Sequence, residues 1–134
     1  MRGINRHLLN IVDDMGLELI FVDMDRSGIY DADDRVIFLS NQLLGRNSDF
    51  EISHELGHCI KKHEELSAYY HATDNGRRKI EREANEIAIK ILLNIYMNEY
   101  DLEKEQLNAV KFMEYYNISG HLENCVRENM LNYA

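Results

Sequence analysis

Proline is absent from this sequence, and so are internal repeats and low-complexity tracts. Because no proline-rich or low-complexity linker interrupts it, the chain offers no candidate boundary between domains. We therefore expect residues 1–134 to form a single domain, which is long enough to enclose one hydrophobic core. The shares of hydrophobic residues (45%) and charged residues (29%) are those of a folded globular protein rather than a disordered one.

Long apolar runs are also missing, since none approaches the roughly 20 residues that a membrane-spanning helix requires. The N-terminal stretch MRGINRHLLNIVDDMG has charges at both ends and an apolar core that is too short for a signal peptide. We therefore expect a cytoplasmic protein with no membrane partner. Cysteine is scarce: Cys59 and Cys125 are far apart and lack metal-binding or disulfide spacing, which predicts two reduced thiols in the core.

Basic residues are few, with 15 lysines and arginines against 24 aspartates and glutamates, so the formal net charge is -9. A chain of this charge repels phosphate, which disfavours direct binding of DNA or RNA unless a local basic patch exists. The nearest approach to such a patch is GRRK at 76–79, and Glu81 interrupts it. We therefore expect no nucleic-acid partner. Acidity of this kind is common among solvated domains and identifies no protein partner by itself.

Hydrophobic periodicity predicts a helix, a small sheet and four further helices, in that order. Apolar residues at helical spacing indicate the first helix over residues 4–15, and short apolar runs indicate strands at 17–25, 28–30 and 35–40. The simplest arrangement of the strands is an antiparallel β-meander within residues 17–40. This order predicts an α+β domain. The four later helices are expected over residues 48–63, 76–97, 101–116 and 119–132.

The helix expected at 48–63 contains HELGH, an H-E-x-x-H motif. Residues four apart lie on the same face of a helix, so His54 and His58 can offer nitrogens to one ion. A catalytic zinc ion binds imidazole at about 2.0–2.1 Å, takes a third protein ligand and retains a water molecule. Glu55 is placed to take the proton of that water and to deliver it to a leaving amine. The motif therefore predicts a zinc site with Glu55 as the catalytic carboxylate.

The distribution of apolar residues around this helix favours a metal site over a chance match. The two histidines point to nearly the opposite side from the apolar face, which suits a helix with a core side and a metal side. Gly57 would let another backbone approach closely. The apolar face consists of Ile52, Leu56, Cys59 and Ile60.

The third zinc ligand has to come from another part of the chain. The segment KIEREANEIAIKILL at 79–93 offers Glu81, Glu83 and Glu86. Relative to the apolar stripe of this helix, Glu86 points almost directly away, whereas Glu81 and Glu83 lie on opposite flanks. Helical geometry therefore excludes Glu86 and leaves Glu81 and Glu83 as candidates.

HELGH, followed about 20 to 30 residues later by EREANEIA, resembles the ImmA/IrrE family of zinc metallopeptidases. The family pattern is HExxH plus a downstream E-x-E-A-N-x-F-A-like helix, and the resemblance covers roughly residues 17–97. Ile87 stands where the family has an aromatic residue, a departure that concerns packing more than chemistry.

The resemblance implies a gluzincin-like site that holds Zn²⁺. In such a site His54 and His58 are metal ligands and Glu55 is the catalytic carboxylate. The third ligand is Glu83, the glutamate directly before the Ala-Asn pair, and Glu81 is the reserve candidate.

The resemblance also implies a substrate. We expect no extra C-terminal domain of the kind found in the larger radiation-response members, since the chain is similar to the compact members encoded near phage and mobile-element repressors. Those relatives cleave a helix-turn-helix repressor and thereby release gene expression. The alternative is a non-catalytic antirepressor or adaptor that keeps the zincin fold and binds its partner without cutting it. The intact Glu55 argues against this alternative, because a purely structural site has no use for an unliganded carboxylate beside the metal.

Two other segments contain candidate functional residues. DMDRSGIYDADD at 23–34 partly matches a calcium-binding EF-hand loop, but it ends in aspartate and is flanked by strand-like segments. A solvated hairpin turn is therefore the favoured interpretation. Tyr69, Tyr70 and His71, between the two zinc motifs, are candidate oxyanion donors, although packing within a loop is the simpler role for each.

Overall fold

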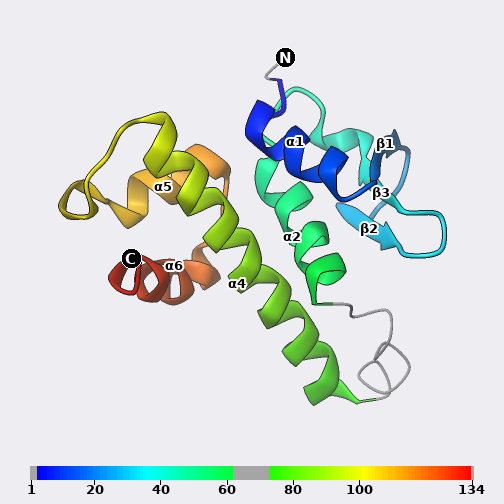
Figure 1. The fold of residues 1–134 in the computed structure, drawn as a ribbon. Coiled ribbons are helices and arrows are strands. Elements are labelled where there is room, and N and C mark those ends of the chain that lie inside the picture. Colours follow the sequence, from blue (N-terminus) through cyan, green and yellow to red (C-terminus); the bar gives the residue numbers. More distant parts are fainter. Residues whose placement is uncertain (1–2, 62–72, 134) are drawn as a thin grey trace.

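The structure of the chain, a computed structural model, describes residues 3–61 and 73–133. A small three-stranded sheet near the N-terminus is combined with helices, which confirms the expected α+β class (Figure 1). In the described part of the chain, no helix combines the length and the apolar character that crossing a membrane requires.

The first helix, α1 (Arg6–Asp14), begins after Asn5, whose side-chain oxygen accepts hydrogen bonds from the backbone N–H groups of His7 and Leu8. This cap satisfies two N–H groups that have no partner within the helix. The helix buries Leu8 and Val12 and ends before Gly16 (φ +69°). It is slightly shorter than the expected helix over residues 4–15.

The strands form a mixed sheet in the order β1-β3-β2. β3 (Val36–Ser40) runs parallel to β1 (Glu18–Val22) and antiparallel to β2 (Gly28–Asp31). The expected antiparallel meander is therefore wrong, because a meander would place β2 in the centre. β3 takes that place because it is the most buried strand, with Ile37 and Leu39 fully buried, whereas the four-residue β2 lies at the edge.

Helices α2 (Asp49–Ile60) and α4 (Asp74–Glu99) lie side by side (Figure 1). Their closest approach is at Gly57, where an added Cβ atom would lie 2.7 Å from the carbonyl oxygen of Ala84 and 2.8 Å from its Cα. Only glycine allows the backbones to come this near. This contact agrees with the role expected for Gly57 and sets how α4 faces α2.

The core has two parts. α1, the sheet and α2 enclose one cluster around Leu8, Ile37 and Leu56. The C-terminal half of α4 encloses the other with α5 (Ala109–Tyr116) and α6 (Glu123–Leu131), around Phe112 and Tyr116. The helices expected at 101–116 and 119–132 therefore begin later than predicted. The short 3₁₀ helices are Asn41–Leu43, Lys104–Gln106 and Gly120–Leu122.

The two cysteines are free thiols, as expected. Cys59 is buried on α2, whereas Cys125 on α6 is only partly buried. Three of the four residues expected on the apolar face of α2 are buried, namely Ile52, Leu56 and Cys59. The fourth, Ile60, is 45% exposed and does not belong to this face.

Candidate metal site

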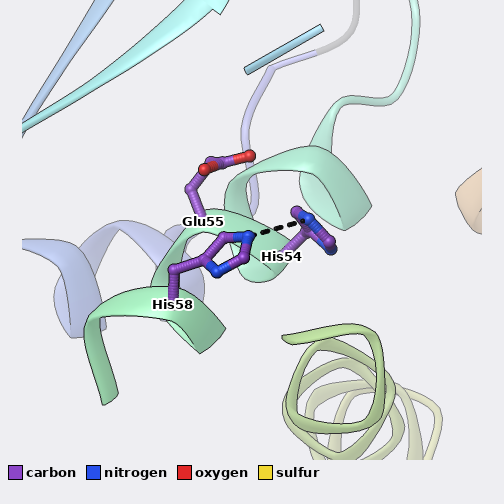
Figure 2. A group of neighbouring side chains, drawn as sticks. All are labelled: His54, Glu55 and His58. Atoms are coloured by element: carbon purple, nitrogen blue, oxygen red, sulfur yellow. Dashed lines mark hydrogen bonds between the residues drawn. The ribbon is translucent and has the colours of Figure 1, made fainter. Parts of the chain in front are cut away.

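Three side chains of α2 gather at one point, His54, Glu55 and His58 (Figure 2). Their possible ligand atoms all lie within 4.8 Å of one another. The Nε2 atoms of the two imidazoles are 3.2 Å apart, and the rings meet edge to face. The one-turn spacing of the H-E-x-x-H motif therefore places two ring nitrogens so that they face a shared point.

α4 brings a carboxylate to the same point. Oε2 of Glu81 lies 2.9 Å from Nε2 of His54, and Oε1 lies 3.4 Å from Nε2 of His58. The two histidine side chains are only 16% and 14% exposed, whereas that of Glu81 is 52% exposed. The three groups thus form a partly buried cluster that joins two helices which are separate in the sequence.

The structure brings Glu81 to the histidines and does not place Glu83 among the residues that line their pocket. Ala84 packs against Gly57, so it marks the face of α4 that contacts α2. Glu81 precedes Ala84 by three residues and shares that face. Glu83 directly precedes Ala84, so its side chain points about 100° away from Ala84 around the helix axis. Glu86, which helical geometry excluded as a ligand, forms an ion pair with Lys90.

Asn85, one helical turn after Glu81, orients His54. Its Oδ1 lies 2.7 Å from Nδ1 of His54. An amide oxygen can only accept, so Nδ1 carries a proton. In the neutral imidazole the lone pair of Nε2 then faces the cluster, whereas in the protonated ring Nε2 donates to Glu81. In the sequence, Asn85 stands out only as part of EREANEIA, which does not indicate this role. The four-residue spacing from Glu81 is the signal that could have revealed it.

The pKa values of the cluster reflect its charges. Burial alone lowers the pKa of His54, but the hydrogen bond to Glu81 and the charges of Glu55 and Glu81 outweigh burial and raise the pKa above its ordinary value. Hydrogen bonds from His54 and His58 hold the pKa of Glu81 far below its usual range. Glu81 is therefore an anion at every ordinary pH, which suits a group that faces a cation.

Glu55 lies beside the cluster and is only 7% exposed. Burial raises the pKa of its carboxyl group, and the positive charges of His54, His58 and Arg26 offset part of that rise. Gly28, the first residue of β2, packs directly on this carboxylate. A Cβ atom there would lie 3.0 Å from Oε2, so a side chain at this position would push Glu55 out of place.

An open pocket of about 400 Å³ surrounds the cluster. One wall comes from the segment 25–28, which leads into β2 and was considered above as part of a calcium loop. The candidate oxyanion donors Tyr69, Tyr70 and His71 lie outside the described residues. The described lining residues are Asp25, Arg26, Ser27, Gly28, His54, Glu55, His58 and Glu81.

Comparisons with known proteins bear on this arrangement. Residues 12–121 match the model of the IrrE N-terminal-like domain, a peptidase family. Among solved structures, the chain is similar to a Mycobacterium tuberculosis transcriptional regulator, with a TM-score of 0.59 and 17% sequence identity. The match covers 94% of this chain and 48% of that one, so the chain spans about half the length of the regulator. At this level of identity, the structural similarity shows a shared fold and nothing further. No curated protein matches the chain.

Proposed function

The chain belongs to the IrrE N-terminal-like domain family of peptidases, and we propose that it is a zinc-dependent endopeptidase that cleaves a specific regulatory protein. One observation carries the proposal. Two imidazoles from α2 and a carboxylate from α4 converge on a single point, and the buried carboxylate of Glu55 lies beside them. Family membership makes hydrolysis of a peptide bond the natural reaction for such a site.

The donor set fits zinc. Two imidazoles and one carboxylate are a usual ligand set of catalytic zinc and leave one position open. Ligand atoms about 2.0–2.1 Å from a tetrahedral centre lie about 3.3 Å apart. The separations among the nitrogens of His54 and His58 and the oxygens of Glu81 are 3.2, 2.9 and 3.4 Å. We therefore assign these three residues as the ligands, with Glu81 in the place for which family resemblance favoured Glu83.

The reaction divides between metal and protein. A zinc ion held by His54, His58 and Glu81 would supply Lewis acidity to the scissile carbonyl and to the attacking water. Glu55 takes the proton of the attacking water and passes it to the nitrogen of the leaving amine. A raised pKa suits this double role, because the carboxyl group must both accept and release a proton. The backbone of Gly28 confines that carboxylate.

The substrate has a natural place to bind. Among the described strands, β2 pairs only with β3, so its other edge is open, and its first residue lines the pocket. An extended peptide can add to this edge as another strand and pass over Glu55. Resemblance to the compact family members supports a cytoplasmic helix-turn-helix repressor of a phage or mobile element as that substrate.

Glu55→Gln tests the catalytic function. The variant keeps all three proposed ligands, so it should bind zinc in a 1:1 ratio, whereas loss of the general base should slow cleavage by roughly 10²- to 10⁴-fold. The assay incubates zinc-loaded protein with the repressor encoded beside its gene, measures fragments by mass spectrometry and measures bound metal by elemental analysis.

Glu114→Gln, an exposed change on α5, is the control and should cleave like the wild type. If wild type and Glu55→Gln both inactivate the repressor without cutting it, the protein is a non-catalytic antirepressor and the peptidase proposal is wrong.

A further inference from the structure

Arg26 lies at the mouth of the pocket, on the loop between β1 and β2. Its side chain is exposed, and it lines the same cavity as the two histidines and Glu55. Two residues further along the chain, Gly28 packs on Glu55 and β2 begins. A peptide held along this edge and cut beside Glu55 would therefore pass close to the guanidinium group of Arg26.

Arg26 is opposite in charge to the acidic residues that line the pocket with it. Among the described residues that line the pocket, it is the only lysine or arginine, and Asp25, Glu55 and Glu81 are carboxylates. The whole chain has a formal net charge of -9. An acidic substrate group is therefore repelled by most of this protein and attracted at one position next to the site of cleavage.

Several other arginines of the structure already have partners. Arg46 pairs with Glu51, and Arg127 pairs with Glu123, each at 2.8 Å. Arg26, in contrast, makes no hydrogen bond or ion pair with the described residues, and it acts on Glu55 only through its charge. Because Arg26 is exposed, the five N–H donors of its guanidinium group are accessible to an incoming ligand.

We propose that Arg26 is a specificity residue that binds a carboxylate of the substrate close to the cleaved bond. Guanidinium and carboxylate match as a bidentate pair, which a neutral side chain cannot reproduce with Arg26. The carboxylate comes either from an aspartate or glutamate side chain or from the C-terminus of the substrate. The inference rests on the proposed function, because it assumes that peptides are cut at this site.

Cleavage profiling with a proteome-derived peptide library tests the inference. Zinc-loaded wild type, Arg26→Gln and Arg26→Glu are each incubated with the library, and the cut sites are read by mass spectrometry. Wild type should favour peptides with a carboxylate at one fixed position by about tenfold or more, the effect of one charged hydrogen-bonded pair. Arg26→Gln should lose the preference, and Arg26→Glu should replace it with a preference for lysine or arginine at the same position.

A second copy of the library with amidated C-termini separates the two sources of the carboxylate. If the preference is for a C-terminus, amidation abolishes it, whereas a preference for acidic side chains survives. Arg6→Glu, an exposed charge reversal on α1, is the control and should leave the profile unchanged. Bound zinc and the thermal midpoint are measured for every variant to establish that it is folded.

Three results would overturn the inference. Wild type that cuts peptides without any acidic preference leaves the peptidase function standing and removes the role of Arg26. An equal loss of cleavage for all peptides in Arg26→Gln shows that the residue acts on a group common to every substrate. Wild type that cuts no peptide and no repressor refutes the proposed function, and the inference falls with it.

Discussion

At the scale of single residues, the site depends on which carboxylate of α4 meets the histidines of α2. Glu81 contacts both imidazoles with different oxygens. The same α4 face carries Asn85, which fixes the ring of His54 from the other side. Glu81 and Asn85 are one turn apart, so a single face of α4 supplies both the proposed third ligand and the group that orients the first.

Replacement of individual residues on α4 should therefore produce graded losses of zinc. Asn85→Ala should weaken binding by roughly 10- to 100-fold, the range for partners of metal ligands. Glu81→Gln should weaken it further, because it removes a charged ligand. Glu83→Gln, two residues away, should stay close to wild type. Competition with a chromophoric chelator measures all three affinities. A normal affinity for Glu81→Gln together with a loss in Glu83→Gln would return the ligand role to Glu83.

The sequence predicted some of these residues and not others, for reasons of distance along the chain. His54, Glu55 and His58 lie within five consecutive positions, so helical geometry alone relates them. The choice between Glu81 and Glu83 depends on how α4 is rotated against α2, and that rotation is set by packing between residues far apart in the sequence. Arg26 was missed because a loop carries it, and no periodicity places a loop residue beside a helix.

At the scale of secondary-structure elements, the contact between α2 and α4 controls the site. Gly57 of α2 packs against the backbone of Ala84 on α4. In an ordinary helix, alanine is more favourable than glycine by about 1 kcal/mol. Here a Cβ atom would lie 2.7 Å from a backbone oxygen, which cannot move without displacing α4 itself.

Gly57→Ala should consequently lower the free energy of unfolding by about 1–3 kcal/mol, the usual range for overpacking. It should also weaken zinc binding, because the displaced α4 carries Glu81 away from the histidines. Urea denaturation of the metal-free protein measures the first effect, and chelator competition the second. Gly120→Ala is the matched control, since a Cβ atom there has no neighbour within 4 Å. Equal stability of Gly57→Ala and wild type would show that the helices can separate at little cost.

Strands and helices were easier to predict than their arrangement. Local patterns indicated three strands, but their order depends on which strand gains most from the central position. β3 buries Ile37 and Leu39 completely and lies between β1 and β2. The position of β2 at the edge of the described sheet supports the proposed function, because the edge that does not pair with β3 is where we propose that a substrate strand binds.

At the scale of the whole molecule, α4 connects the two hydrophobic clusters. Ile95 belongs to the cluster around the sheet and α2, whereas Ile89, Leu92 and Leu93 belong to the cluster with α5 and α6. The proposed metal ion would also join α4 to α2, through Glu81 on one helix and the two histidines on the other. Since the ligands come together only in the folded chain, zinc should bind the native state in preference to the unfolded one.

Zinc should therefore raise the thermal midpoint, by an amount that falls on acidification. At a free zinc concentration 100 times the dissociation constant, the stabilisation is about 2.7 kcal/mol. Protons compete with zinc for His54, whose pKa is raised in the metal-free fold by its hydrogen bond to Glu81 and by the nearby carboxylates. That raised pKa also stabilises the metal-free fold at low pH and ceases to do so as pH rises through it. Glu81 stays ionised throughout, because its pKa is strongly lowered.

Because zinc has to displace a proton from His54 at low pH, the zinc-dependent rise of the midpoint should be large at pH 8 and small at pH 6. Differential scanning fluorimetry with buffered zinc or with a chelator measures this rise at each pH. His54→Ala should show little of it at either pH, because one ligand is missing. A rise of equal size at pH 6 and pH 8 would mean that zinc binds without displacing a proton from His54, and the ion would then have to be bound elsewhere on the chain.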